Sequence, residues 1–127
     1  MPIDERRCNE TILLVDDEPL VRGVIERILG GRGYTVLSAA SPEEGLRLSR
    51  EHDVDAIVTD VVMPSMSGPA LVAELRRERP QLRALFISGY TSEVVVEVGL
   101  GEDEVAFVQK PFTAGAIASR LRQLLDA

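Results

Sequence analysis

Several residue types that mark common protein classes are rare or missing in this chain. A single cysteine, Cys8, leaves no partner for an internal disulfide and favours a free thiol in an intracellular protein. The formal net charge is −7 with no basic cluster, which disfavours direct binding to nucleic acid or to an anionic membrane surface. No apolar run is long enough to span a membrane, and the first ten residues lack the apolar stretch of a signal peptide. The sequence therefore predicts a cytoplasmic protein.

Aromatic residues make up 4% of the chain and tryptophan is absent, so the core must be built from aliphatic side chains. Hydrophobic residues account for 45% of the 127 positions, a composition that disfavours disorder. A chain of this length fits one ordinary domain with one core. We expect residues 1–10 to form a polar tail and residues 11–127 to form that domain.

Five short apolar segments predict strands. Most of them are continuous and not alternating, as expected of strands whose two faces are both covered in a parallel sheet. The segments are 11–16, 35–39, 56–60, 84–88 and 105–109.

Helical patterns lie between and after these segments. The glycine-rich turn at 30–33 is expected to end a first helix, in which apolar residues spaced three and four apart share one face. These residues are Leu20, Val21, Val24, Ile25, Ile28 and Leu29. Three further helices are expected to begin at Ser41, Ser67 and Thr113, because serine and threonine hydroxyl groups cap helices well.

The segment 91–100 contains the β-branched run Val94–Val96, which propensity alone assigns to a strand. A connection between parallel strands needs a crossover, so we predict a short helix there instead. Five strands alternating with five helices predict an α/β fold with right-handed crossovers and helices on both faces of the sheet. The expected architecture is a flavodoxin-like (βα)5 three-layer sandwich with strand order 2-1-3-4-5.

Polar and charged residues stand at the ends of four predicted strands. Asp16 and Asp17 close the first, Asp60 the third, Ser88 the fourth and Lys110 the fifth. Carboxyl ends of parallel strands share one edge, where ligands bind in open α/β sheets, so these side chains should converge. Three neighbouring carboxylates repel one another without a cation, and hard oxygen ligands suit Mg²⁺. Such a site would bind a phosphoryl group, with Asp60 as the accepting nucleophile.

Each of these residues also has a structural explanation when taken singly. An aspartate after a strand often caps a helix, a serine often forms a turn, and a lysine before proline is usually a solvated surface charge. Asp60 is harder to explain in this way, since the apolar Val61 and Val62 follow it and no cap is needed before Ser67. The joint arrangement therefore favours a functional site.

Four motifs carry a resemblance to a known family: VDDEP at 15–19, TDVVMPSMSG at 59–68, FISGY at 86–90 and FVQKPF at 107–112. Over about residues 11–126 the chain resembles the receiver domain of two-component response regulators. The resemblance implies a phosphoacceptor domain of a phosphorelay. Such a domain is not an enzyme acting on other substrates, because it catalyses only its own Mg²⁺-dependent phosphorylation and dephosphorylation.

The resemblance also implies roles for the residues of the metal site. Asp60 would be the phosphoacceptor, and Asp17 and Asp60 would ligate Mg²⁺, for which Mn²⁺ can substitute. The backbone carbonyl of Val62 would be a third ligand. Asp16 would act mainly through a metal-bound water.

A second set of roles concerns the phosphoryl group and the conformational switch. By resemblance, Ser88 and Lys110 would contact the phosphoryl oxygens, and the bond between Lys110 and Pro111 would be a cis peptide. Phe107 stands where the family carries an aromatic switch, whose inward rotation accompanies movement of Ser88. Ordinary core packing is the alternative role for Phe107, and the two roles are compatible.

The implied phosphoryl donor is a phosphohistidine on a histidine kinase or phosphotransfer domain. His52, the single histidine, lies at a predicted helix end and is expected on the surface, which argues against this chain being the donor. The face around segment 91–100, the fifth strand and the last helix would signal to an output partner. The stretch ISGYTSE at 87–93 resembles receivers fused to hybrid sensor kinases, and a single-domain regulator is an equal alternative.

Two side chains predict a long-lived aspartyl phosphate. Val62 has no polar group that could steer an attacking water. Tyr90 is bulky enough to shade the phosphoryl group.

Three other functions share parts of this pattern. Aspartate-nucleophile phosphatases resemble the chemistry but carry a second aspartate where this chain has Val62. A flavin or nucleotide module would need a glycine- or serine-rich phosphate loop where Asp16, Asp17 and Glu18 would repel phosphate. A pure protein-binding scaffold would not need the full set of site residues.

Overall fold

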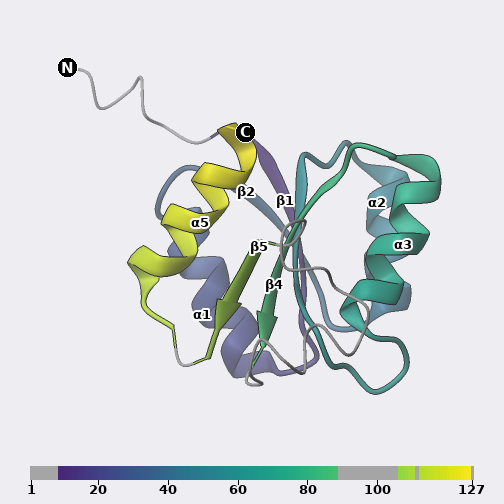
Figure 1. Cartoon of the computed structure of the whole chain (residues 1–127), viewed down its shortest axis with the longest axis horizontal. Helices are drawn as coiled ribbons and strands as arrows, with labels where there is room; N and C mark the ends of the chain where they lie inside the picture. The colour runs from purple at the N-terminus through teal and green to yellow at the C-terminus, as the bar shows by residue number, and fades with distance from the viewer. Residues whose placement is uncertain (1–8, 89–105, 111, 127) are drawn as a thin grey trace.

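Five strands form one sheet with helices on its two faces (Figure 1). The computed structural model describes residues 9–88, 106–110 and 112–126. The strands are β1 (Thr11–Val15), β2 (Thr35–Ala39), β3 (Ala56–Asp60), β4 (Arg83–Ser88) and β5 (Ala106–Gln109). The helices are α1 (Pro19–Gly30), α2 (Pro42–Glu51), α3 (Gly68–Glu78) and α5 (Ala114–Asp126).

The sheet is parallel throughout and has the order β2-β1-β3-β4-β5. Figure 1 shows α1 and α5 on one face and α2 and α3 on the other. The predicted flavodoxin-like architecture and strand order are therefore confirmed, and all five strand segments lie within a residue or so of their predicted bounds.

The continuous apolar character of the strands follows from two hydrophobic clusters, one on each face of the sheet. Successive side chains of β1 alternate between them, with Ile12 and Leu14 in the cluster under α1 and α5. Leu13 and Val15 belong to the cluster under α3. Both faces of the sheet are covered, so side chains on either face must be apolar. This explains why the strands lack the alternation of polar and apolar residues found in a half-exposed sheet.

The predicted helix starts are confirmed by their capping bonds. The hydroxyl oxygen of Ser41 accepts from the backbone N–H of Glu44 at 3.2 Å. Ser67 caps α3 in the same way at 3.1 Å, and Thr113 caps α5 at 3.0 Å. At the other end of α1, Gly33 has φ 103°, a left-handed conformation that glycine adopts without strain.

The buried face of α1 is narrower than the sequence predicts. Ile25 and Leu29 are fully buried, whereas Leu20 is 85% exposed and Val24 is 48% exposed. Helical residues are about 100° apart, so a stripe that includes Leu20 and Val24 extends beyond the sector facing the sheet. The prediction that these two residues lie on the buried face was wrong, and they form an exposed apolar strip.

Some predicted features lie outside the described residues. These are the free thiol Cys8, the bulky Tyr90, the short helix at 91–100 and the cis peptide at Pro111. Within the described ranges, none of the helices combines the length and hydrophobicity needed to cross a membrane.

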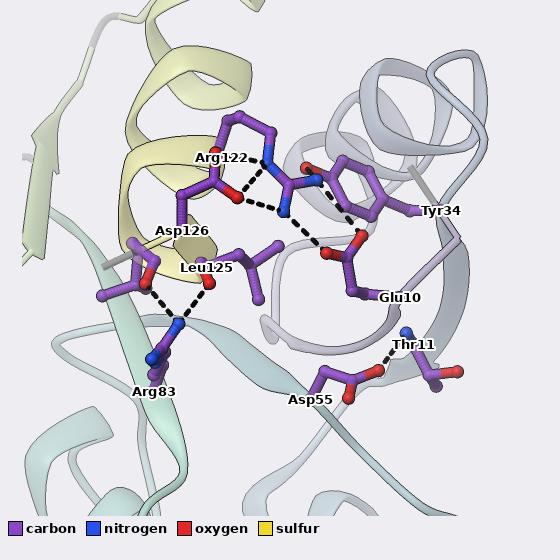
Figure 2. A network of polar contacts seen from close by, with 9 residues as sticks. Glu10, Thr11, Tyr34, Asp55, Arg83, Arg122, Leu125 and Asp126 are labelled. Atoms are coloured by element: carbon purple, nitrogen blue, oxygen red, sulfur yellow. Dashed lines mark hydrogen bonds and ion pairs between the residues drawn. The ribbon is translucent and has the colours of Figure 1, made fainter. Parts of the chain in front are cut away.

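A polar network joins the amino edge of the sheet to the end of α5 (Figure 2). The guanidinium of Arg122 donates to Glu10, Asp126 and the hydroxyl of Tyr34. The guanidinium of Arg83, at the start of β4, donates to the last carbonyls of α5. These contacts lie at the edge of the sheet opposite to the predicted site. They therefore fix α5 to the sheet and leave the predicted site free.

Candidate functional site

The residues predicted to form the site do converge at the carboxyl edge of the sheet. Asp16 and Asp17 follow β1, and Asp60 is the last residue of β3. One carboxylate oxygen from each of the three lies within 4.8 Å of the others. The ammonium nitrogen Nζ of Lys110, just after β5, lies 3.1 Å from Oδ2 of Asp60. Four residues from three distant parts of the chain therefore share one site.

Asp60 is nearly buried, with 7% of its surface exposed. Its Oδ1 accepts the backbone N–H of Val62 at 3.2 Å, and its Oδ2 pairs with Lys110. The strand delivers the residue to this point because the N–H of Val61 still bonds to Ile87 of β4 at 3.0 Å. A charged carboxylate is tolerated at this depth because both oxygens have partners.

Asp16 is buried more completely, at 1% exposure, and it is less well satisfied. Its Oδ1 accepts the backbone N–H of Glu18 at 2.9 Å, whereas its buried Oδ2 has no hydrogen-bond partner among the described residues. Burial raises the pKa of Asp16 to about 6, with the charges of Asp60 and Asp17 adding to the rise. The bond from Glu18 and the charge of Lys110 oppose that rise in pKa.

This unsatisfied oxygen tests whether the residues fit a metal ion. A buried carboxylate oxygen without a donor, beside two further carboxylates, is the environment that a hard divalent cation would stabilise. Asp17 is exposed, so the cluster is open to solvent on that side, which leaves room for water ligands. The donor set of Asp16, Asp17 and Asp60 therefore fits Mg²⁺.

Lys110 remains a cation in this site. Burial on its own lowers the pKa of Lys110, but the hydrogen bond and charge of Asp60, with the charges of Asp16 and Glu18, outweigh that effect and raise it. The backbone N–H of Lys110 donates to the carbonyl of Ser88 at 2.7 Å. Ser88 is fully buried at the end of β4, so the two predicted phosphoryl-contacting residues are joined through the backbone.

Phe107 lies on β5 beside the hydrophobic cluster under α3. It is partly buried and packs against that cluster, and it pairs in register with Phe86 of β4. Its carbonyl accepts from the guanidinium of Arg120 at 3.2 Å. Core packing, which the sequence gives as one of its two compatible roles, is confirmed.

The site includes neighbours to which the sequence assigned no role. Oε1 of Glu18 lies 3.9 Å from Nζ of Lys110, so Lys110 has a second acidic neighbour. The hydroxyl of fully buried Thr59 donates to the carbonyl of Asp60 at 3.1 Å. Arg22 donates to the carbonyl of Asp16 at 2.8 Å. The position of Arg22 early in a helix was the sequence signal available, because a cation is unfavourable there.

The fold and the site together define a flavodoxin-like α/β domain with an acidic centre at the carboxyl edge of its sheet. A family model described as the response regulator receiver domain matches residues 12–122. The chain belongs to the response regulator receiver domain family.

Two curated relatives illustrate where such domains occur. The chain is 40% identical over 118 residues to the sensor kinase CckA of Brucella abortus, covering 91% of this chain and 12% of the kinase. It is 33% identical over 115 residues to the transcriptional regulatory protein AfsQ1 of Streptomyces coelicolor, covering 91% of this chain and 51% of that regulator. The chain thus spans about half or less of these relatives, which are a kinase and a transcriptional regulator.

Solved structures agree with the fold. The receiver domain of the hybrid histidine kinase CckA superimposes with a TM-score of 0.76 at 38% identity, covering 91% of this chain and 98% of that domain. The chemotaxis protein CheY4 of Vibrio cholerae gives a TM-score of 0.84 at 26% identity, covering 92% of this chain and 99% of CheY4.

Proposed function

We propose that this domain accepts a phosphoryl group on Asp60 and signals through the resulting change in conformation. The observation that carries the proposal is the closeness of Asp60 both to the ammonium of Lys110 and to the carboxylates of Asp16 and Asp17. Phosphoryl transfer needs positioning and neutralisation of charge more than covalent help from the protein. Family membership supports the same activity.

The proposed donor is a phosphohistidine on a histidine kinase or phosphotransfer domain. A carboxylate oxygen of Asp60 forms a bond to phosphorus while the bond from phosphorus to the imidazole nitrogen breaks. The electron pair of the broken bond stays on that nitrogen, which takes up a proton. Lys110 holds a phosphoryl oxygen by charge and Ser88 holds another by its hydroxyl. We place this activity in the cytoplasm, where ATP supplies the kinase.

Mg²⁺, with Mn²⁺ as a substitute, is the proposed cofactor, and when bound it neutralises charge on the phosphoryl oxygens. Asp17, Asp60 and the backbone carbonyl of Val62 would hold it directly, and Asp16 would contact one of its waters. The buried Oδ2 of Asp16, which no described residue contacts by a hydrogen bond, supports this assignment.

Partner binding is proposed for two surfaces. The donor would approach the acidic centre, and the exposed side chains of Leu20 and Val62, close in sequence to Asp17 and Asp60, would offer it apolar contact area. The output partner would bind the face around segment 91–100, β5 and α5. The relatives among kinases and transcriptional regulators support both kinds of partner.

Acetyl phosphate labelling tests the proposal. With Mg²⁺ present, intact-mass measurement should show one phosphoryl adduct on the wild-type chain and none on Asp60→Asn. Asp53→Asn is the matched control, because Asp53 has an exposed side chain at the opposite edge of the sheet, and it should label normally. An unlabelled wild-type chain, as a pure scaffold would give, or an adduct that persists in Asp60→Asn, contradicts the proposal.

A further inference from the structure

Arg22 occupies a position that its own helix does not favour. It lies in the first turn of α1, a helix of 12 residues that begins at Pro19 and has no acidic residue in that turn. The amino end of a helix carries a partial positive charge, so a cation is unfavourable there. Something other than the helix must account for its placement.

The contact that Arg22 makes reaches back to the end of β1. Its Nη1 donates to the backbone carbonyl of Asp16 at 2.8 Å, and the side chain is partly buried. None of the ion pairs between described residues involves Arg22. The bond from Arg22 is therefore made to the backbone of Asp16 and not to a carboxylate. Through this bond Arg22 fixes the peptide group that follows Asp16.

Together with other bonds, this contact leaves Asp16 little freedom. The N–H of Asp16 donates to the carbonyl of Ala39 at 3.2 Å, and its Oδ1 accepts the N–H of Glu18. With Arg22 on its carbonyl, Asp16 is held on both sides of its backbone and at one side-chain oxygen. The remaining oxygen, Oδ2, is the buried one that has no hydrogen-bond partner in the described part of the chain.

We propose that Arg22 is a positioning residue for the cation site. By holding the carbonyl of Asp16, Arg22 keeps the carboxylate of Asp16 with those of Asp17 and Asp60 in the arrangement that a divalent ion needs. This inference rests on the proposed function, since it assumes that the acidic cluster binds Mg²⁺.

Charge and positioning predict opposite effects for removal of Arg22, which makes the inference testable. The positive charge of Arg22 repels a divalent cation, so its loss by itself would tighten Mg²⁺ binding. Loss of the bond to Asp16 would release the carboxylate and weaken Mg²⁺ binding. The inference requires the second effect to be larger, as found when residues that orient the groups around a metal ion are removed.

The experiment is a Mg²⁺ titration by calorimetry at constant ionic strength. Arg22→Met, which removes both the charge and the donor, should raise the Kd for Mg²⁺ about tenfold, the lower end of the range for loss of a residue that orients the groups around a metal ion. Arg22→Gln keeps a hydrogen-bond donor but loses the charge, and Arg22→Lys keeps both. The Kd of each for Mg²⁺ should lie between those of Arg22→Met and wild type. Arg27→Met is the matched control, since Arg27 lies in the last turn of the same helix, and it should bind like wild type.

A second measurement separates positioning from a general loss of stability. For each variant, the rise in Tm at saturating Mg²⁺ is compared with its own metal-free Tm, because a ligand stabilises only through its affinity for the folded state. If Arg22→Met binds Mg²⁺ as tightly as wild type or more tightly, even with a lower metal-free Tm, the inference is wrong. If the wild-type chain itself binds no Mg²⁺, the proposed function fails as well.

Discussion

The two oxygens of Asp60 have different partners, and that difference organises the site at the scale of single residues. Oδ1 faces the backbone of Val62 and Oδ2 faces Lys110. Asp16, in contrast, has one oxygen satisfied and one not. The three acids are therefore not equivalent: both oxygens of Asp60 have partners, and Asp16 is the one that a cation would stabilise most.

Val62 allows a prediction about how long the phosphoryl group survives. Its side chain is 46% exposed beside Asp60 and has no polar atom to orient a hydrolytic water. We expect the phosphorylated wild-type domain to decay slowly in Mg²⁺ buffer, and Val62→Asn to decay several-fold faster, because an amide can position the water. The measurement is the half-life of the adduct by intact mass. Tyr90→Ala should shorten it too, if Tyr90 shades the phosphoryl group.

Val24→Asn is the control for this prediction, because Val24 is a valine of similar exposure, at 48%, on α1. It should leave the half-life unchanged. A wild-type half-life of seconds, or equal effects at Val62 and Val24, would show that the side chain at 62 does not set the rate.

At the scale of elements, the junction between β3 and α3 depends on a glycine. A Cβ atom added at Gly68 would clash with the carbonyl oxygen of Asp60, and the N–H of Gly68 donates to the carbonyl of Val61 at 2.8 Å. The first residue of α3 therefore packs directly on the backbone that carries the proposed phosphoacceptor. Absence of a side chain is what permits this approach.

Gly68→Ala should destabilise the domain by about 2 kcal/mol, because neither the helix nor the end of the strand can move away without disturbing Asp60. Gly23→Ala is the matched control. No atom of the described residues lies within 4 Å of a Cβ at Gly23 inside α1, so Gly23→Ala should stabilise the domain by about 0.5 to 1 kcal/mol through helix propensity. Urea unfolding midpoints measure both changes. Shifts in the same direction would show that the close approach of Gly68 to the backbone of Asp60 does not limit the side chain at position 68.

At the scale of the whole molecule, the two edges of the sheet have different tasks. The carboxyl edge carries the acidic centre, and the amino edge carries the network of Figure 2. There Arg122 lies 2.6 Å from Glu10, a residue 112 positions away in the chain. This contact fixes the end of α5 to the residue that precedes β1.

The pair predicts a pH dependence of stability. The hydrogen bond from Arg122 lowers the pKa of Glu10 below its ordinary value of 4.5, so the folded state favours the charged carboxylate. The contribution of the pair is therefore present above pH 4.5 and is lost as the pH falls through the lowered pKa. Arg122→Gln should reduce stability at neutral pH by about 1 kcal/mol and make the loss on acidification smaller.

Thermal unfolding from neutral pH down to about pH 3 measures this effect. Arg47→Gln is the control, because Arg47 pairs with Glu51 at 3.2 Å in an exposed position within α2 and should contribute little. If the two variants lost stability equally at every pH, the network of Figure 2 would have no special role in the fold.

The sequence was sufficient to predict the strands, the caps and the convergence of the site residues. Each rests on local features or on one general rule. Apolar runs that are continuous require two covered faces, and parallel strands place their carboxyl ends at the same edge. From these, Asp60 and Lys110 could be placed together before any distance was known.

Other features of the molecule could not be predicted from the sequence, because they depend on distances between elements that local sequence patterns do not encode. The rotation of α1 left Leu20 exposed, although its spacing matches the buried stripe. The bond from Arg22 to Asp16, the unsatisfied Oδ2 of Asp16 and the link from Arg122 to Glu10 exist because packing brings those groups within reach. Periodicity and capping act over one or two helical turns, whereas the environment of a buried charge is set by every element that packs around it. Local patterns in the sequence were thus enough to bring Asp16, Asp17, Asp60, Ser88 and Lys110 to one edge. Packing added Glu18, Thr59 and Arg22 around them and fixed which of their atoms have hydrogen-bond partners.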